Sequence, residues 1–135
     1  MNTSRGSTKD AGWEMGARKT FPVPLGQAWE FLTGPGLELW LGTLDPADLT
    51  TVSGSYLTGE GTRGELRSRT ENKVLRLTWQ PSGAPSDSTV QLRVLPARSG
   101  TTISFHHERL TGPAERESML AHWRKVLDAI GAKLS

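Results

Sequence analysis

An apolar stripe near the C-terminus constrains the fold more than any other feature of this sequence. Its members recur at the spacing of one helix face: Met119, Leu120, Trp123, Val126, Leu127, Ile130 and Leu134. Pro113 suits the first position of a helix, and Glu115 lies in the first turn, where the helix dipole favours an acidic side chain. The pattern predicts one helix of about 21 residues, roughly 30 Å long, with a single apolar face.

Most of the chain before this helix alternates between apolar and polar residues, as half-buried strands do. Residues 13–21 form one expected strand, and turn residues divide the stretch from Tyr56 to Arg109 into an antiparallel meander. The sheet should therefore have about six strands. Each strand has one apolar face, so the sheet and the long helix must bury their apolar faces against each other.

Two short helices are expected between the first strand and the meander. Leu25, Ala28, Trp29 and Leu32 share one helix face, and Pro24 suits the first helical position. The second helix has Leu37, Trp40 and Leu41 on one side. Residues 42–55 are weakly patterned and support no prediction. The sequence thus predicts an α+β fold.

Length and composition narrow the class of protein. A chain of 135 residues suits one domain, which we place at residues 13–135, after a small and polar segment, residues 1–12, that is expected to be a disordered tail. The formal net charge is only +2, so no electrostatic signature of nucleic-acid binding is present. The absence of cysteine excludes disulfides, thiolate metal sites and cysteine nucleophiles. No apolar run is long enough for a membrane span, and a cytoplasmic protein is expected.

Several short motifs, in their order and spacing, resemble one known superfamily. They are Phe21-Pro22-Val23-Pro24 with Ala28-Trp29, the tryptophan motif of residues 35–41, the strand motifs of residues 61–66 and 75–79, the segment from Gly100 to Leu110, and Trp123 in the last helix. Together they resemble the SRPBCC superfamily (START-like or Bet v 1-like). Within it they resemble the branch named after the activator of heat-shock-protein-90 ATPase. The resemblance covers residues 13–134.

The resemblance implies a helix-grip fold, in which a curved antiparallel sheet grips the long C-terminal helix around an apolar cavity. The expected function is the binding of a small hydrophobic or aromatic molecule, with no evident catalysis and no cofactor. The expected lining residues are Trp40, Leu66, Leu77, Trp79, Phe105, His107, Trp123 and Leu127. Three large indole rings in so short a chain leave two alternatives open: a small pocket, or a core filled by side chains.

Two adjacent histidines are the remaining candidates for chemistry. Adjacent strand residues point to opposite faces, so His106 and His107 cannot share a metal ion, and no metal site is expected. His107 follows Ile103 and Phe105 at intervals of two residues along the strand, so it should share their side and face the helix. It is the weak catalytic candidate, as the proton-transfer group of a cyclase or dehydratase-type enzyme. The alternatives are a ligand contact and a purely structural, hydrogen-bonded histidine.

A third function class is a protein-interaction module like the co-chaperones of the family. Arg63, Arg67 and Arg69 alternate along one expected strand and should lie on one face. They suit either an acidic partner or a solvated outer face that discourages sheet-to-sheet pairing. A homodimer is also open, although no residue pattern specifies its interface.

Overall fold

The computed structural model describes residues 7–8 and 12–134, and its strands form one antiparallel sheet of seven strands in the order β1-β2-β7-β6-β5-β4-β3. The strands are listed here with their bounds: β1 (Ser7–Thr8), β2 (Gly12–Phe21), β3 (Ser55–Leu57), β4 (Arg63–Thr70), β5 (Val74–Trp79), β6 (Ser88–Ala97) and β7 (Gly100–Leu110). Neighbours from β3 to β7 follow chain order, so the expected meander is confirmed. The two-residue β1 lies within the segment expected to be a disordered tail. The rest of that expectation, for residues 1–6 and 9–11, lies outside the described residues.

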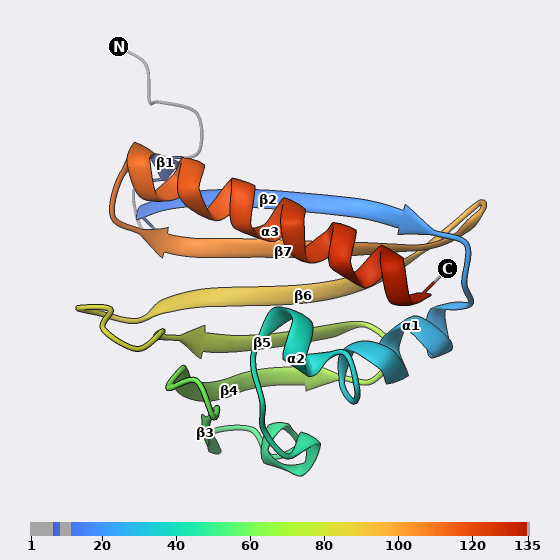
Figure 1. Ribbon diagram of the computed structural model, residues 1–135, viewed down its shortest axis with the longest axis horizontal. Helices are drawn as coiled ribbons and strands as arrows, with labels where there is room; N and C mark the ends of the chain where they lie inside the picture. Colours follow the sequence, from blue (N-terminus) through green and yellow to red (C-terminus); the bar gives the residue numbers. More distant parts are fainter. Residues whose placement is uncertain (1–6, 9–11, 135) are drawn as a thin grey trace.

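The helices occupy one face of the sheet (Figure 1). They are α1 (Leu25–Leu32), α2 (Leu37–Trp40), a short 3₁₀ helix η1 (Pro46–Leu49) and the long α3 (Pro113–Leu134). Figure 1 shows α3 running obliquely over β2 and β7, with α1 near the C-terminal end of α3 and α2 nearer the middle of the sheet. The structure confirms the α+β architecture with two short helices after a long strand and one long C-terminal helix.

The apolar face of α3 is buried as its spacing predicts. Trp123, Val126, Leu127, Ile130 and Leu134 are buried against the sheet, whereas Met119 and Leu120 in the N-terminal half of the helix are only partly buried. The N-terminal half of α3 therefore covers its side of the sheet less completely than the C-terminal half does.

Local backbone details differ from the expectation at one place and add to it at another. Pro24 is the N-cap of α1, with extended backbone angles, and not its first helical residue. The stretch from 42 to 55, for which the sequence supports no prediction, contains η1. Asp45 caps η1 by accepting a hydrogen bond from the backbone N–H of Ala47, and Leu49 is buried. Neither detail changes the expected order of elements.

Candidate functional site

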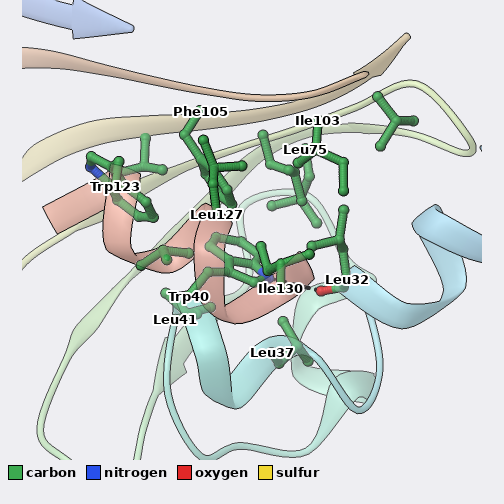
Figure 2. Close-up of a cluster of buried hydrophobic side chains, with 14 of the residues drawn as sticks. Leu32, Leu37, Trp40, Leu41, Leu75, Ile103, Phe105, Trp123, Leu127 and Ile130 are labelled. Atoms are coloured by element: carbon green, nitrogen blue, oxygen red, sulfur yellow. Dashed lines mark hydrogen bonds between the residues drawn. The ribbon is translucent and has the colours of Figure 1, made fainter. Parts of the chain in front are cut away.

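The middle of the space between the sheet and α3 is filled by side chains. Of the eight expected lining residues, all but Trp79 are at most 3% exposed. The rings of Phe105 and Trp123 are stacked with centroids 4.5 Å apart, and the ring of Trp40 lies 5.7 Å from that of Phe105. Figure 2 shows these rings packed with Leu127 and Ile130 in one cluster. At this depth the residues expected to line a cavity serve as the hydrophobic core.

His107 belongs to this buried layer and is hydrogen-bonded through both ring nitrogens. The indole N–H of Trp123 donates to His107 Nδ1 over 3.0 Å, so Nδ1 carries no proton. The proton is therefore on Nε2, which donates to Ser88 Oγ at 2.7 Å, and Ser88 in turn donates to the carbonyl oxygen of Trp79 at 3.2 Å. This chain joins α3, β7, β6 and β5.

Burial keeps His107 neutral. Loss of hydration, assisted by the neighbouring His122 and His106, lowers the pKa of His107 to about 3. A neutral imidazole with both nitrogens engaged and no exposed surface holds four elements together. The arrangement matches the structural alternative for His107 more closely than the proton-transfer alternative.

A second aromatic layer lies beside His107, toward the N-terminal end of α3. Trp79 meets His107 edge-on with ring centroids 4.9 Å apart, and His122 lies edge-on to Trp123 at 4.8 Å. The ring centroids of Trp79 and His122 are 6.1 Å apart. Burial and the neighbouring Lys125 lower the pKa of His122, so this imidazole also favours the neutral form.

Two polar atoms in this layer are buried without a hydrogen-bond partner among the described residues. They are Nε1 of Trp79 and Nε2 of His122. Buried polar groups are paired in the great majority of native structures, and an unpaired one costs about 1–3 kcal/mol. The other indole nitrogens of the core are paired: Trp40 Nε1 donates to the carbonyl oxygen of Leu32 at 2.9 Å, and Trp123 Nε1 to His107. The unpaired atoms set this layer apart from the filled core.

Trp79 also lines a pocket of about 170 Å³ at the end of the sheet. The pocket lies between the loop joining β5 to β6, the end of β7 and the first turns of α3. Met119 and Pro85 supply apolar wall, and Ser88, Arg109 and Glu115 supply polar groups. None of the other seven expected lining residues borders this pocket. It is therefore located at one end of the expected cavity, with Trp79 at its boundary.

A β-bulge near the end of β7 shapes the rim of this pocket. The register between β2 and β7 shifts between the pairs Trp13–Leu110 and Met15–His107, and Arg109 has a left-handed φ of 63°. Bulges redirect side chains at strand ends. Here Leu110 is buried, while Arg109 reaches across to Thr89 Oγ1 at 2.9 Å and to the Asp87 carboxylate at 3.0 Å. Strict alternation in the sequence gives no sign of this bulge.

The other histidine of the pair, His106, lies on the opposite face of the sheet. Its Nε2 is 2.8 Å from a carboxylate oxygen of Glu14, and its Nδ1 is 3.6 Å from a carboxylate oxygen of Glu108. The two carboxylates therefore meet different nitrogens of the ring. Among residues 7–8 and 12–134, no three histidine, aspartate or glutamate side chains converge as metal ligands.

The expected arginine stripe on β4 is wrong for Arg69. A bulge between Leu66 and Ser68 interrupts the alternation of this strand. The side chain of Arg69 is only 15% exposed and donates to the carbonyl oxygen of Leu49 at 2.8 Å. It also pairs with Glu71 and lies over the ring of Trp29. Arg69 thus connects α1 and η1 to the hairpin of β4 and β5, and only Arg63 and Arg67 stay on the exposed outer face.

Sequence reasoning missed several residues of the candidate site. His122 precedes the buried Trp123 on α3, and Ser88 begins β6, but neither stands in a motif. Their contacts depend on which residues of separate strands and helices meet, as Ser88 and His107 do across 19 positions of sequence. The nearest signal in the sequence is the polar and proline-rich loop of residues 81–88, which forms one wall of the pocket.

Solved structures share this fold at low sequence identity. The crystal structure of CalU16 from Micromonospora echinospora is 22% identical with a TM-score of 0.76, over 95% of this chain and 81% of CalU16. DynU16, described as a protein of the dynemicin biosynthetic locus, is 17% identical with a TM-score of 0.72, over 90% of this chain and 46% of DynU16. The Aha1 dimer from Colwellia psychrerythraea is 15% identical with a TM-score of 0.69, over 90% of this chain and 95% of that one.

Sequence comparisons alone do not assign the chain to a protein family. No family model matches it, and no curated protein does.

In the part of the chain that the structure describes, no helix has the length and apolar character needed to cross a membrane. The structural likeness confirms, at the level of the fold, the resemblance that the motifs carry, and an Aha1 structure is among the similar ones. The chain therefore has the helix-grip fold of the SRPBCC proteins.

Proposed function

We propose that residues 13–135 act as one binding domain for a small aromatic or aliphatic molecule that carries a polar group. The binding site is the pocket under the N-terminal half of α3, with Trp79 as its inner wall. The observation that carries this proposal is the unpartnered buried Nε1 of Trp79, a residue of the pocket wall. The second unpartnered atom, Nε2 of His122, belongs to the ring beside Trp79 and not to the pocket lining. A ligand hydroxyl or carbonyl oxygen that reached Trp79 Nε1 would accept the hydrogen bond that the described residues do not accept.

The size and the lining of the pocket favour a compact ligand. A cavity of about 150 Å³ holds a molecule the size of benzene, so a pocket of about 170 Å³ encloses about one ring, and a second ring would extend toward its mouth. Aromatic and apolar walls with a few placed polar groups are typical of small-molecule sites. A long lipid chain would require the stacked rings of Phe105 and Trp123 to separate. The fold itself is compatible with ligand binding, as the likeness to helix-grip structures indicates.

The indole N–H resonances in a proton–nitrogen NMR spectrum test this proposal directly. We expect 2-naphthol to shift the Trp79 indole signal, because the phenolic oxygen can accept the unpaired N–H. The Trp40 indole signal should stay in place, since its N–H is already bonded to Leu32. Naphthalene, which has the same rings and no hydroxyl, should bind more weakly, by a factor of about 5 or more.

A pocket-filling variant separates this site from the surface of the protein. Ala84 borders the pocket, and its hydrogen bonds to Gln80 and Pro81 are made by its backbone and do not depend on its side chain. Ala84→Trp should abolish the 2-naphthol shifts, whereas Ala121→Trp, on the exposed side of α3, should leave them unchanged. If 2-naphthol leaves the Trp79 signal unmoved in the wild-type protein, or still moves it in Ala84→Trp, the proposed site is wrong.

A further inference from the structure

The charged side chains around the ligand pocket do not balance. Three of the residues that line it are charged, namely Asp87, Arg109 and Glu115. Arg109 donates to the Asp87 carboxylate over 3.0 Å, so these two side chains form a neutral pair. The residue that follows Glu115 on α3, Arg116, donates to the backbone carbonyl oxygen of Glu14 on β2 and does not border the pocket. Glu115 therefore gives the pocket one uncompensated negative charge.

Glu115 is held in place by the start of α3. Its carboxylate oxygen Oε1 accepts two hydrogen bonds from Thr111, from the backbone N–H at 2.7 Å and from the hydroxyl at 3.0 Å. A glutamate of the first helical turn that binds back to the preceding backbone stabilises the helix start, so this contact is structural. The other carboxylate oxygen, Oε2, has no hydrogen-bond partner among the described residues. Because Glu115 is exposed and borders the pocket, this oxygen is open to a ligand at the rim.

The one cation among the described lining residues, Arg109, is already engaged. It donates through Nε to Thr89 and through Nη2 to Asp87. Two polar groups of the lining remain without a partner at different depths: the buried indole N–H of Trp79 in the inner wall, and Glu115 Oε2 at the rim. A ligand that complements both has a hydrogen-bond acceptor at its inner end and a cationic donor at its outer end.

We propose that the pocket selects aromatic amines, compact one-ring molecules with an oxygen acceptor at one end and a protonated amino group at the other. This inference rests on the proposed function and names the ligand class for the same pocket. The ring packs against Trp79, Pro85 and Met119, and its oxygen accepts from Trp79 Nε1. The amino group lies at the rim and donates to Glu115 Oε2, as a charge-assisted hydrogen bond. An anionic ligand of the same size meets the like charge of Glu115 and binds more weakly.

Three phenols that differ only at one end test this charge preference: tyramine, 4-propylphenol and 3-(4-hydroxyphenyl)propionate. Each has a hydroxyl oxygen that can accept from Trp79, and a short chain that ends in an ammonium, a methyl or a carboxylate group. An ion pair at an exposed site changes affinity by up to about fivefold, and repulsion of a like charge acts in the opposite direction. We therefore expect tyramine to bind about fivefold or more tightly than the propionate, measured by titration of the Trp79 indole signal.

Glu115→Gln tests whether this carboxylate is the source of the preference. The glutamine side-chain oxygen can still accept from Thr111, so the start of α3 should stay folded, which far-UV circular dichroism checks. We expect the preference for tyramine over the propionate to fall to about twofold or less, and the affinity for 4-propylphenol to change by less than about twofold. The matched control Glu117→Gln removes the same charge from an exposed position of α3 that does not border the pocket, and should keep the preference.

The outcomes distinguish the amine preference from the pocket itself. If 2-naphthol shifts the Trp79 signal but tyramine and the propionate bind the wild type equally well, the amine preference is wrong and the pocket stands. A preference that persists in Glu115→Gln also overturns the inference, because the selecting charge would then lie elsewhere. If neither 2-naphthol nor any of the three phenols shifts the Trp79 signal, the pocket is wrong and the amine preference fails with it.

Discussion

Trp123→Ala should be the most destabilising single substitution in the core, lowering the free energy of unfolding by at least about 4 kcal/mol. The indole ring is fully buried and stacked on Phe105, so its removal leaves a large cavity. The substitution also removes the donor to His107 Nδ1 and leaves a buried acceptor unpaired. Small domains are stable by about 5–15 kcal/mol, so the variant could lose much of its folded population. Urea unfolding followed by circular dichroism measures the difference.

Trp123→Phe separates packing from hydrogen bonding in the same position. A phenyl ring can still stack on Phe105 but cannot donate to His107, so we expect a loss of about 1–3 kcal/mol. Trp13→Phe is the matched control, because Trp13 is only partly buried where β2 begins and should lose less than about 1 kcal/mol. If Trp123→Phe is as stable as the wild type, the hydrogen bond to His107 contributes nothing measurable.

The sequence predicts well those elements, or parts of elements, whose periodicity continues without interruption. The apolar stripe of α3 predicts its buried face down to Leu134, and the alternation in β7 predicts that Ile103, Phe105 and His107 share the helix-facing side. Each of these elements presents one apolar face to one core, so residue type and spacing are sufficient. The order of the elements follows from the same patterns and from the turn residues between them.

Predictions fail where the backbone departs from regular alternation. The bulge in β4 turns Arg69 toward Leu49 and Trp29, and the bulge in β7 turns Arg109 toward Asp87. A bulge adds one residue to a strand, so the side chains beyond it point to the opposite face from the one that regular alternation predicts. The cause of the bulge lies in packing between distant segments. Side-chain identity at positions 69 and 109 gives no local sign of it, because arginine suits either an exposed face or an ion pair.

The pocket is the hardest feature to predict from the sequence. Residue types identify Trp40, Trp79 and Trp123 as large side chains of the region between the sheet and α3. Whether they leave space depends on the packing of their rings. Here Phe105 and Trp123 stack and fill the middle, while Trp79 meets His107 edge-on and borders the pocket at the end of the sheet. Such packing follows from the assembled tertiary structure and not from spacing along the chain.

Acid should destabilise the protein between about pH 6.5 and pH 3, and His107 should be a main cause. The pKa of His107 is lowered to about 3 in the folded protein, whereas an unfolded histidine titrates near 6.5. Below pH 6.5 the unfolded chain therefore binds a proton that the folded chain does not, so the free energy of unfolding falls as the pH falls. The contribution of His107 to the free energy of unfolding is fully present above pH 6.5. Below that pH it falls by at most about 1.4 kcal/mol per pH unit. His122, whose pKa is also lowered by burial, adds a change of the same sign.

The variant His107→Asn isolates the histidine's share of this acid sensitivity. Asparagine does not titrate, and its side-chain oxygen can still accept the hydrogen bond from Trp123. The variant should be less stable than the wild type at pH 7, because the bond to Ser88 is lost. Its free energy of unfolding, from urea titrations at several pH values, should nevertheless fall less steeply from pH 6.5 to 4.5. Glu60 and Glu71, whose pKa values hydrogen bonds lower, matter mainly at the acid end of this range and affect both proteins alike. Equal slopes in the two proteins would show that the fold does not hold His107 neutral, and that His107 can take up a proton in the folded protein.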